Sequence, residues 1–138
     1  MINKILEIEA EGWIYFQSSQ FLETYFNFKK HGTGIDPYKE ITGKYLFFHE
    51  DPQILKQIAH EEIMNNGFSC AKINKHLLGT NKEHVLCLYY KDDSRKNELA
   101  KKYQGKEGMK YRYWKSDEDT RKGKYSKEFL DRITSSSK

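Results

Sequence analysis

The chain has 138 residues, about the size of one domain. Charged residues make up 32% of it, but 14% are aromatic, and those large rings supply a core that excludes global disorder. Two prolines and nine glycines exclude a collagen-like chain, and no stretch approaches the roughly 18 apolar residues that span a bilayer. Residues 1–11 are acidic and lack the apolar region of a secretory signal, so we expect a cytoplasmic protein with no membrane partner.

The first half of the chain predicts four elements, and residues 1–11, which mix apolar and acidic side chains, predict none. Aromatic content indicates a strand at Trp13–Phe16. Apolar spacings of three and four indicate a helix over Phe21–Lys30. A second strand is expected at Lys44–His49. A helix should follow over Pro52–Asn66, because an Asp-Pro pair suits its start and an Asn-Gly pair its end.

The second half predicts five elements. Strands are expected at Phe68–Asn74 and at His84–Tyr90, and the latter is apolar on both faces, which favours a central position in the sheet. A capped helix should cover Arg95–Gln104 and lead into a strand at Met109–Lys115. After a polar loop, a short terminal helix is expected at Lys127–Ile133.

Together these elements predict a single domain over residues 1–138 of the α+β class. Its sheet should be curved and mainly antiparallel, with the helices packed on one face. The other face would then be partly open, and a functional site is expected in its lining.

Positive charge is concentrated late in the chain. Residues 1–90 hold nine Lys or Arg against eleven Asp or Glu, whereas residues 91–128 hold thirteen against eight. Such a basic block favours an anionic partner, which can be phosphate, a nucleotide, RNA or an acidic protein. The net charge of +4 is also that of an ordinary solvated surface, so it does not by itself require nucleic acid.

The two cysteines, Cys70 and Cys87, each lie inside an apolar run. They fit small core residues of a protein in a reducing compartment, although a disulfide between neighbouring strands stays open. There is no CxxC pair, and the histidines lack ligand spacing. We therefore expect no metal site and no cofactor.

Four segments resemble a known family in order and spacing. They are Gly43–Phe48, Ala71–Ile73, His84–Asp92 and Tyr113–Tyr125, of which the block from Lys115 is the most specific. They are similar to the phosphothreonine lyase domain-containing family, also known as the basophilic leukemia expressed protein family. The resemblance covers about residues 43–126. It implies a fold like that of translation initiation factor 4E, with a curved antiparallel sheet and helices on its convex side, and its label implies a phosphorylated substrate.

Three lysines in predicted strands are candidate ligand-binding residues: Lys44, Lys72 and Lys115. A lysine that faces the interior is costly unless it meets an anion, so we expect these three to line one anion-binding pocket. Lys44 should share a face with Leu46 and Phe48, and Lys72 one with Cys70 and Phe68. The alternative is that each lysine points into solvent along a sheet edge.

The late polar loop adds four candidate ligand-binding residues: Thr120, Arg121, Lys124 and Tyr125. An arginine grips phosphate with two hydrogen bonds, and hydroxyl groups donate to it. The alternative is a capped turn in which Asp117 and Asp119 accept backbone N–H groups.

Two further residues complete the candidates. His84 begins the strand expected at the sheet centre and is a candidate general acid or base, unless it is simply a histidine at the end of a strand. Trp114 is a candidate base-stacking ring, as in proteins that bind a base between aromatic rings, unless it packs in the core.

Three functions follow from these residues. The first is a module that binds a phosphorylated ligand, a nucleotide or an RNA end, in a basic pocket lined by aromatic rings. The second is an enzyme similar to a phosphothreonine lyase, with Lys72 or Lys115 as catalytic base, His84 as catalytic acid and Arg121 as phosphate clamp. The third is a protein-interaction domain that uses the aromatic N-terminal segment.

Overall fold

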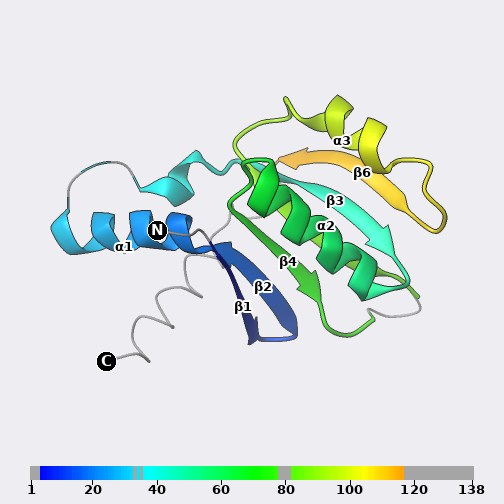
Figure 1. The fold of residues 1–138 in the computed structure, drawn as a ribbon, viewed down its shortest axis with the longest axis horizontal. Helices are drawn as coiled ribbons and strands as arrows, with labels where there is room; N and C mark the ends of the chain where they lie inside the picture. Colours follow the sequence, from blue (N-terminus) through cyan, green and yellow to red (C-terminus); the bar gives the residue numbers. More distant parts are fainter. Residues whose placement is uncertain (1–3, 33, 35, 78–81, 117–138) are drawn as a thin grey trace.

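The computed structural model describes residues 4–32, 34, 36–77 and 82–116 (Figure 1). In chain order their elements are β1 (Ile5–Ala10), β2 (Trp13–Ser18), α1 (Ser19–His31), the 3-10 helix η1 (Pro37–Glu40), β3 (Gly43–His49), α2 (Pro52–Asn65), β4 (Cys70–Asn74), β5 (His84–Tyr90), α3 (Lys96–Tyr103) and β6 (Lys110–Ser116). None of the helices described is long and apolar enough to span a bilayer.

The six strands form one sheet in the order β1-β2-β4-β5-β3-β6, and every neighbouring pair is antiparallel. The predicted α+β class and the central position of β5 are therefore confirmed. The strand β1 was not predicted. It pairs with β2 through a two-residue turn, Glu11 and Gly12, whose φ angles of 55° and 85° match the mirror-image turn that joins tight hairpins.

The helix α2 covers one face of the sheet, which we call the helix face (green in Figure 1). Its start is fixed as predicted, because Asp51 Oδ1 accepts a hydrogen bond of 2.9 Å from the N–H of Gln53 and Pro52 occupies the first turn. The core lies between the two layers. Its fully buried side chains include Leu55 and Ala59 from the helix, and Phe47 and Leu88 from the sheet.

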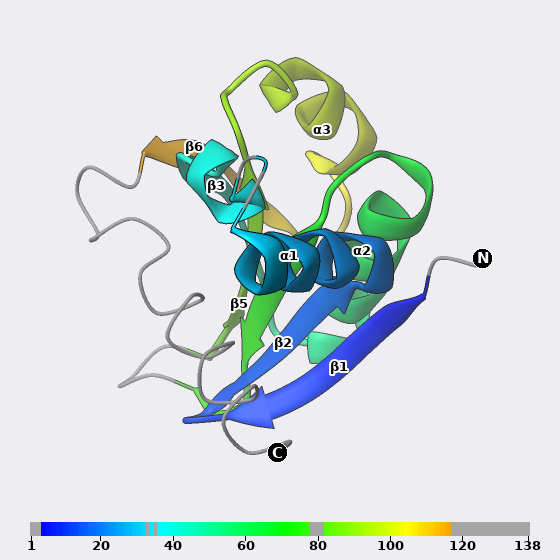
Figure 2. The ribbon, with the colours of Figure 1, turned by 90° about the vertical axis from the view of Figure 1, so that its left-hand side faces the viewer.

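The helix α1 lies at one end of the sheet rather than on the helix face, beside η1 (Figures 1 and 2). From η1, Tyr38 donates a hydrogen bond of 3.1 Å to the buried Gln17 of β2. Just after η1, Ile41 packs against the cluster of Cys70, Cys87 and Tyr89 on the second sheet face. That face is therefore buried at this cluster, whereas its side chains on β6 are exposed, so it is partly open, as expected.

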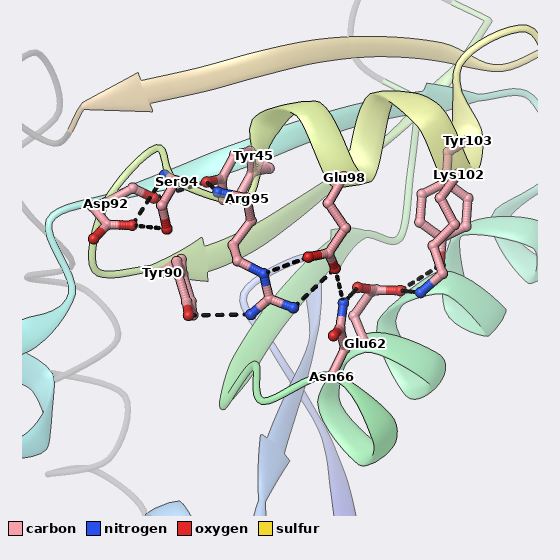
Figure 3. A network of polar contacts seen from close by, with 10 residues as sticks. All are labelled: Tyr45, Glu62, Asn66, Tyr90, Asp92, Ser94, Arg95, Glu98, Lys102 and Tyr103. Atoms are coloured by element: carbon pink, nitrogen blue, oxygen red, sulfur yellow. Dashed lines mark hydrogen bonds and ion pairs between the residues drawn. The ribbon is translucent and has the colours of Figure 1, made fainter.

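A buried carboxylate joins α3 to α2 (Figure 3). Glu62 of α2 is 0% exposed and accepts hydrogen bonds of 2.6 Å from Lys102 Nζ, from the Tyr103 hydroxyl and from Asn66 Nδ2. Burial, together with the hydrogen bond to Glu62, raises the pKa of Tyr103 far above its usual range. Three donors on one buried carboxylate satisfy its acceptor sites and hold the two helices in register.

The network continues to the sheet through Glu98 of α3 (Figure 3). Asn66 also donates to Glu98, and Arg95 donates to Glu98 through Nε at 3.0 Å and Nη2 at 2.9 Å. The same guanidinium donates through Nη1 to the Tyr90 hydroxyl of β5 at 3.1 Å. A continuous polar chain therefore links α2, α3 and β5.

This chain predicts an acid-sensitive step in stability. Hydrogen bonds from Arg95, and then from Asn66, lower the pKa of Glu98 from 4.5 to about 2. Because the folded pKa is the lower one, the stabilisation is present above about pH 4.5 and is lost as the pH falls toward 2. The free energy of unfolding, measured by urea denaturation at several pH values in this window, should fall less steeply with decreasing pH for Glu98→Gln than for the wild type. Glu50→Gln, outside the network, serves as control, and an equal slope in all three proteins would contradict the prediction.

Candidate functional site

The sheet face turned away from α2 is the candidate site, and we call it the basic face. Cross-strand partners share a face, so the pairings identify its members strand by strand. Five of its strand positions are cationic: Lys44, Lys72, Lys110, Arg112 and Lys115. In the six described strands, no position on this face is Asp or Glu, since Glu7 and Glu9 of β1 alternate to the helix face.

Lys72 of β4 lies near the middle of this face and is 6% exposed. Its partners across the sheet are Tyr15 of β2 and Cys87 of β5. Its Nζ lies 3.8 Å from the centre of the Trp13 ring, close enough for a strong attraction between cation and ring in a site largely shielded from water. Trp13 therefore holds Lys72 in place from the neighbouring strand.

Lys44 of β3 is also 6% exposed and has a cross-strand partner on each side. Tyr89 of β5 is on one side, with its ring centre 5.8 Å from Lys44 Nζ. Lys115 of the edge strand β6 is on the other side and is exposed. Two cationic side chains therefore lie directly opposite each other in the pairing of β3 with β6.

A β-bulge decides which β6 side chains belong to the basic face. Tyr45 pairs with Trp114, but its neighbour Leu46 pairs with Arg112, so one extra residue is inserted in β6. Strict alternation would put Arg112 and Trp114 on one face and Lys115 on the other. The bulge instead brings Lys115 to the face of Arg112 and turns Trp114 to the opposite one.

Trp114 accordingly packs on the helix face, away from the lysines. Its ring centre lies 5.1 Å from that of Tyr45, and it joins the edge of the main core. Phe68, which we expected beside Lys72, also lies in that core, with its ring centre 4.7 Å from that of Tyr90. The rings that accompany the buried lysines are those of Trp13 and Tyr89 instead.

His84 also lies apart from the lysines. It is the cross-strand partner of His49, and alternation along β5 puts it on the face of Leu86, the helix face. Its Nδ1 lies 2.9 Å from the main-chain oxygen of Asn74. Since a carbonyl only accepts, Nδ1 carries the proton and is used in a structural hydrogen bond.

The remaining predicted residues, Thr120, Arg121, Lys124 and Tyr125, lie outside the described residues, as does the terminal helix expected at Lys127–Ile133. The structure adds two cations that the sequence reasoning missed, Lys110 and Arg112. The alternation of cations and rings over residues 110–115 was the available signal.

A cavity of about 510 Å³ lies elsewhere, between α2 and the segment that joins α3 to β6. Its charged lining is balanced, with Lys102 and Lys106 against Glu61 and Glu107. Because Lys102 is already bound to Glu62, Lys106 is left against Glu61 and Glu107, so this cavity does not favour an anion. Within the described ranges, no group of three His, Cys, Asp or Glu is placed to hold a metal ion.

Comparisons with protein-family models, with curated proteins and with solved structures each gave no match. A function is therefore inferred from the chemistry of the basic face.

Proposed function

We propose that the basic face binds a phosphorylated ligand, a nucleotide or an RNA end. The observation that carries this proposal is the charge of the face: five cationic strand positions with no carboxylate among the strand residues described there. A phosphate bound beside this cross-strand pair can accept charge-assisted hydrogen bonds from Lys115 and Lys44.

The exposure of the cations differs across the basic face, and this difference suggests the side from which a ligand enters. Lys115 and Arg112 on the edge strand β6 are exposed, whereas Lys44 and Lys72 are 6% exposed. The exposed pair attracts an anion from solution, and the shielded pair binds it where the local dielectric constant is lower and Coulomb attraction is stronger. The rings of Trp13 and Tyr89 flank the inner lysines.

Binding is favoured over a lyase-like reaction by the position of His84. That scheme needs a base and an acid on the same substrate, and His84 lies on the helix face with its Nδ1 hydrogen-bonded to Asn74. A fold like that of translation initiation factor 4E remains part of the proposal. An antiparallel sheet with α2 on one face and cations on the other supports it.

A thermal-shift panel tests the proposal. The probes are pyrophosphate, mononucleotides, a cap analogue and a phosphothreonine peptide. At about 100 times its dissociation constant, a ligand adds roughly 2.7 kcal/mol of stability, which in a chain of this size raises Tm by roughly 8–10 °C. We expect such a shift with pyrophosphate and with at least one nucleotide.

The variants locate the binding. Lys115→Met keeps the apolar stem of an exposed side chain, and Lys72→Met keeps the packing on Trp13. Each should weaken binding by roughly 10- to 100-fold, since a hydrogen bond to a charged group is worth about 1.5–3 kcal/mol. Lys56→Met is the control, because it removes the same charge from α2, where Lys56 pairs with Glu7. A flat panel, or equal losses in all three variants, overturns the proposal, and phosphate released from the peptide overturns the preference for binding.

A further inference from the structure

The basic face extends beyond the pair of inner lysines. The bulge gives β6 three cations on one side: Lys110, Arg112 and Lys115. Their partners on β3, Phe48 and Lys44, are four positions apart, so the row is roughly 13 Å long at about 3.3 Å per residue. All three are exposed. One end of this row is continuous with the inner site, because Lys115 is the direct partner of Lys44.

From this row we infer that the ligand is a single-stranded nucleic acid whose backbone follows β6, rather than a mononucleotide. The inference rests on the proposed function and extends the same site. A mononucleotide engages the cations at one end of the row only. A strand with several phosphates engages the row along its length, and one line of cations matches one backbone rather than the two of a duplex.

Arg112 supplies a feature that a simple charge row lacks. Its guanidinium lies over the Phe48 ring of β3, with Cζ 5.5 Å from the ring centre. Phe48 is partly buried and Arg112 is exposed, so the ring supports the guanidinium from below. Unpaired bases stack on guanidinium planes of this kind as well as on aromatic rings. Arg112 is therefore expected to contact a base as well as a phosphate. Lys110 contributes less, because it is paired with Glu83 at 3.2 Å.

The test compares ligands of increasing length on the full chain. Labelled oligouridylates of two, four and eight nucleotides are titrated at several salt concentrations by fluorescence anisotropy, with uridine monophosphate and pyrophosphate as competitors. Affinity should rise from the dimer to the tetramer, and log K should fall linearly with log salt. For single strands each phosphate contact contributes about −0.7 to that slope, so Lys115→Ala should reduce it by about 0.7.

Arg112→Ala should reduce the slope by the same amount and also remove a stacked base, whereas Arg112→Lys should restore the slope without the stacking. Lys56→Ala, on the opposite face, should change neither quantity. An oligodeoxythymidylate arm tests the need for the 2′-hydroxyl, and a polyglutamate arm tests whether negative charge alone is sufficient.

The failures of the two proposals are distinguishable. If pyrophosphate competes but affinity does not depend on length, the phosphate site stands and the extended strand is overturned. Polyglutamate that binds as tightly as the octamer, or Arg112→Ala that binds like the wild type, also overturns the extended strand. If no probe binds, both proposals fall.

Discussion

Glu62→Ala is expected to lower the free energy of unfolding by about 3 kcal/mol, within the range for breaking a buried ion pair. The substitution leaves the buried Tyr103 hydroxyl without the acceptor that lies 2.6 Å away, and it opens a cavity between α2 and α3. Lys102 is partly exposed and turns to water, which keeps the loss at the lower end of the range. Chemical denaturation monitored by far-ultraviolet circular dichroism measures the change.

Two matched variants separate the causes. Glu62→Gln keeps the volume and an acceptor oxygen, so it should cost clearly less than Glu62→Ala. Tyr103→Phe removes only the hydroxyl, and combined with Glu62→Ala it should cost less than the sum of the single losses, because both remove the same hydrogen bond. Strict additivity, or a loss below about 1 kcal/mol for Glu62→Ala, would show that this carboxylate does not hold α3 in place.

The second large effect is expected at Gly43, the first residue of β3. A Cβ atom there would lie 2.4 Å from Cζ2 of Trp114 and 2.6 Å from the main-chain oxygen of Lys115. Gly43→Ala should therefore push β6 away from β3 and cost about 3 kcal/mol, at the upper end for overpacking. Because that shift also displaces Lys115 and Arg112, ligand affinity should fall together with stability.

Gly12→Ala is the control for this substitution. Nothing lies within 4 Å of a Cβ atom at Gly12, but its φ of 85° is unfavourable for alanine. We expect a cost of roughly 1 kcal/mol there from backbone strain alone, with ligand binding unchanged. Denaturation measures both costs, and Trp fluorescence in a Trp13→Phe background reports Trp114 alone, which should change its environment only in Gly43→Ala. A stable Gly43→Ala protein with unchanged fluorescence would be incompatible with the close packing of Trp114 on β3.

Elements with local determinants could be predicted from the sequence. The helix α2 has its aspartate cap, its proline and its apolar spacing within one short segment, and the structure places it where expected. The strand β1 was missed because its turn is Glu11-Gly12, which lacks the Asn-Gly or Asp-Gly pair that normally indicates a tight hairpin. Its short alternation of apolar and acidic residues becomes a strand only by pairing with β2.

The composition of the candidate site depended on pairings between distant strands. Lys44, Lys72 and Lys115 were identified from single strands, and the register places all three on one face. Trp114 was grouped with them because it is adjacent to Lys115 in the sequence. Its true side depends on the bulge opposite Tyr45, and a bulge leaves no mark in local composition. The packing of Ile41 on the second sheet face could not be predicted either, since it depends on the path that the chain takes between β2 and β3.

The bulge and the cations of β6 also affect how the chain meets copies of itself. An edge strand offers a row of backbone groups on which another chain can add, and this is a common route to aggregation. In β6 that row is interrupted near Tyr113, and Lys110, Arg112 and Lys115 repel an identical strand. A variant that replaced all three cations with apolar residues would thus become prone to stack edge to edge, whatever its affinity for a ligand. The cations of β6 therefore also oppose edge-to-edge association between copies of the chain.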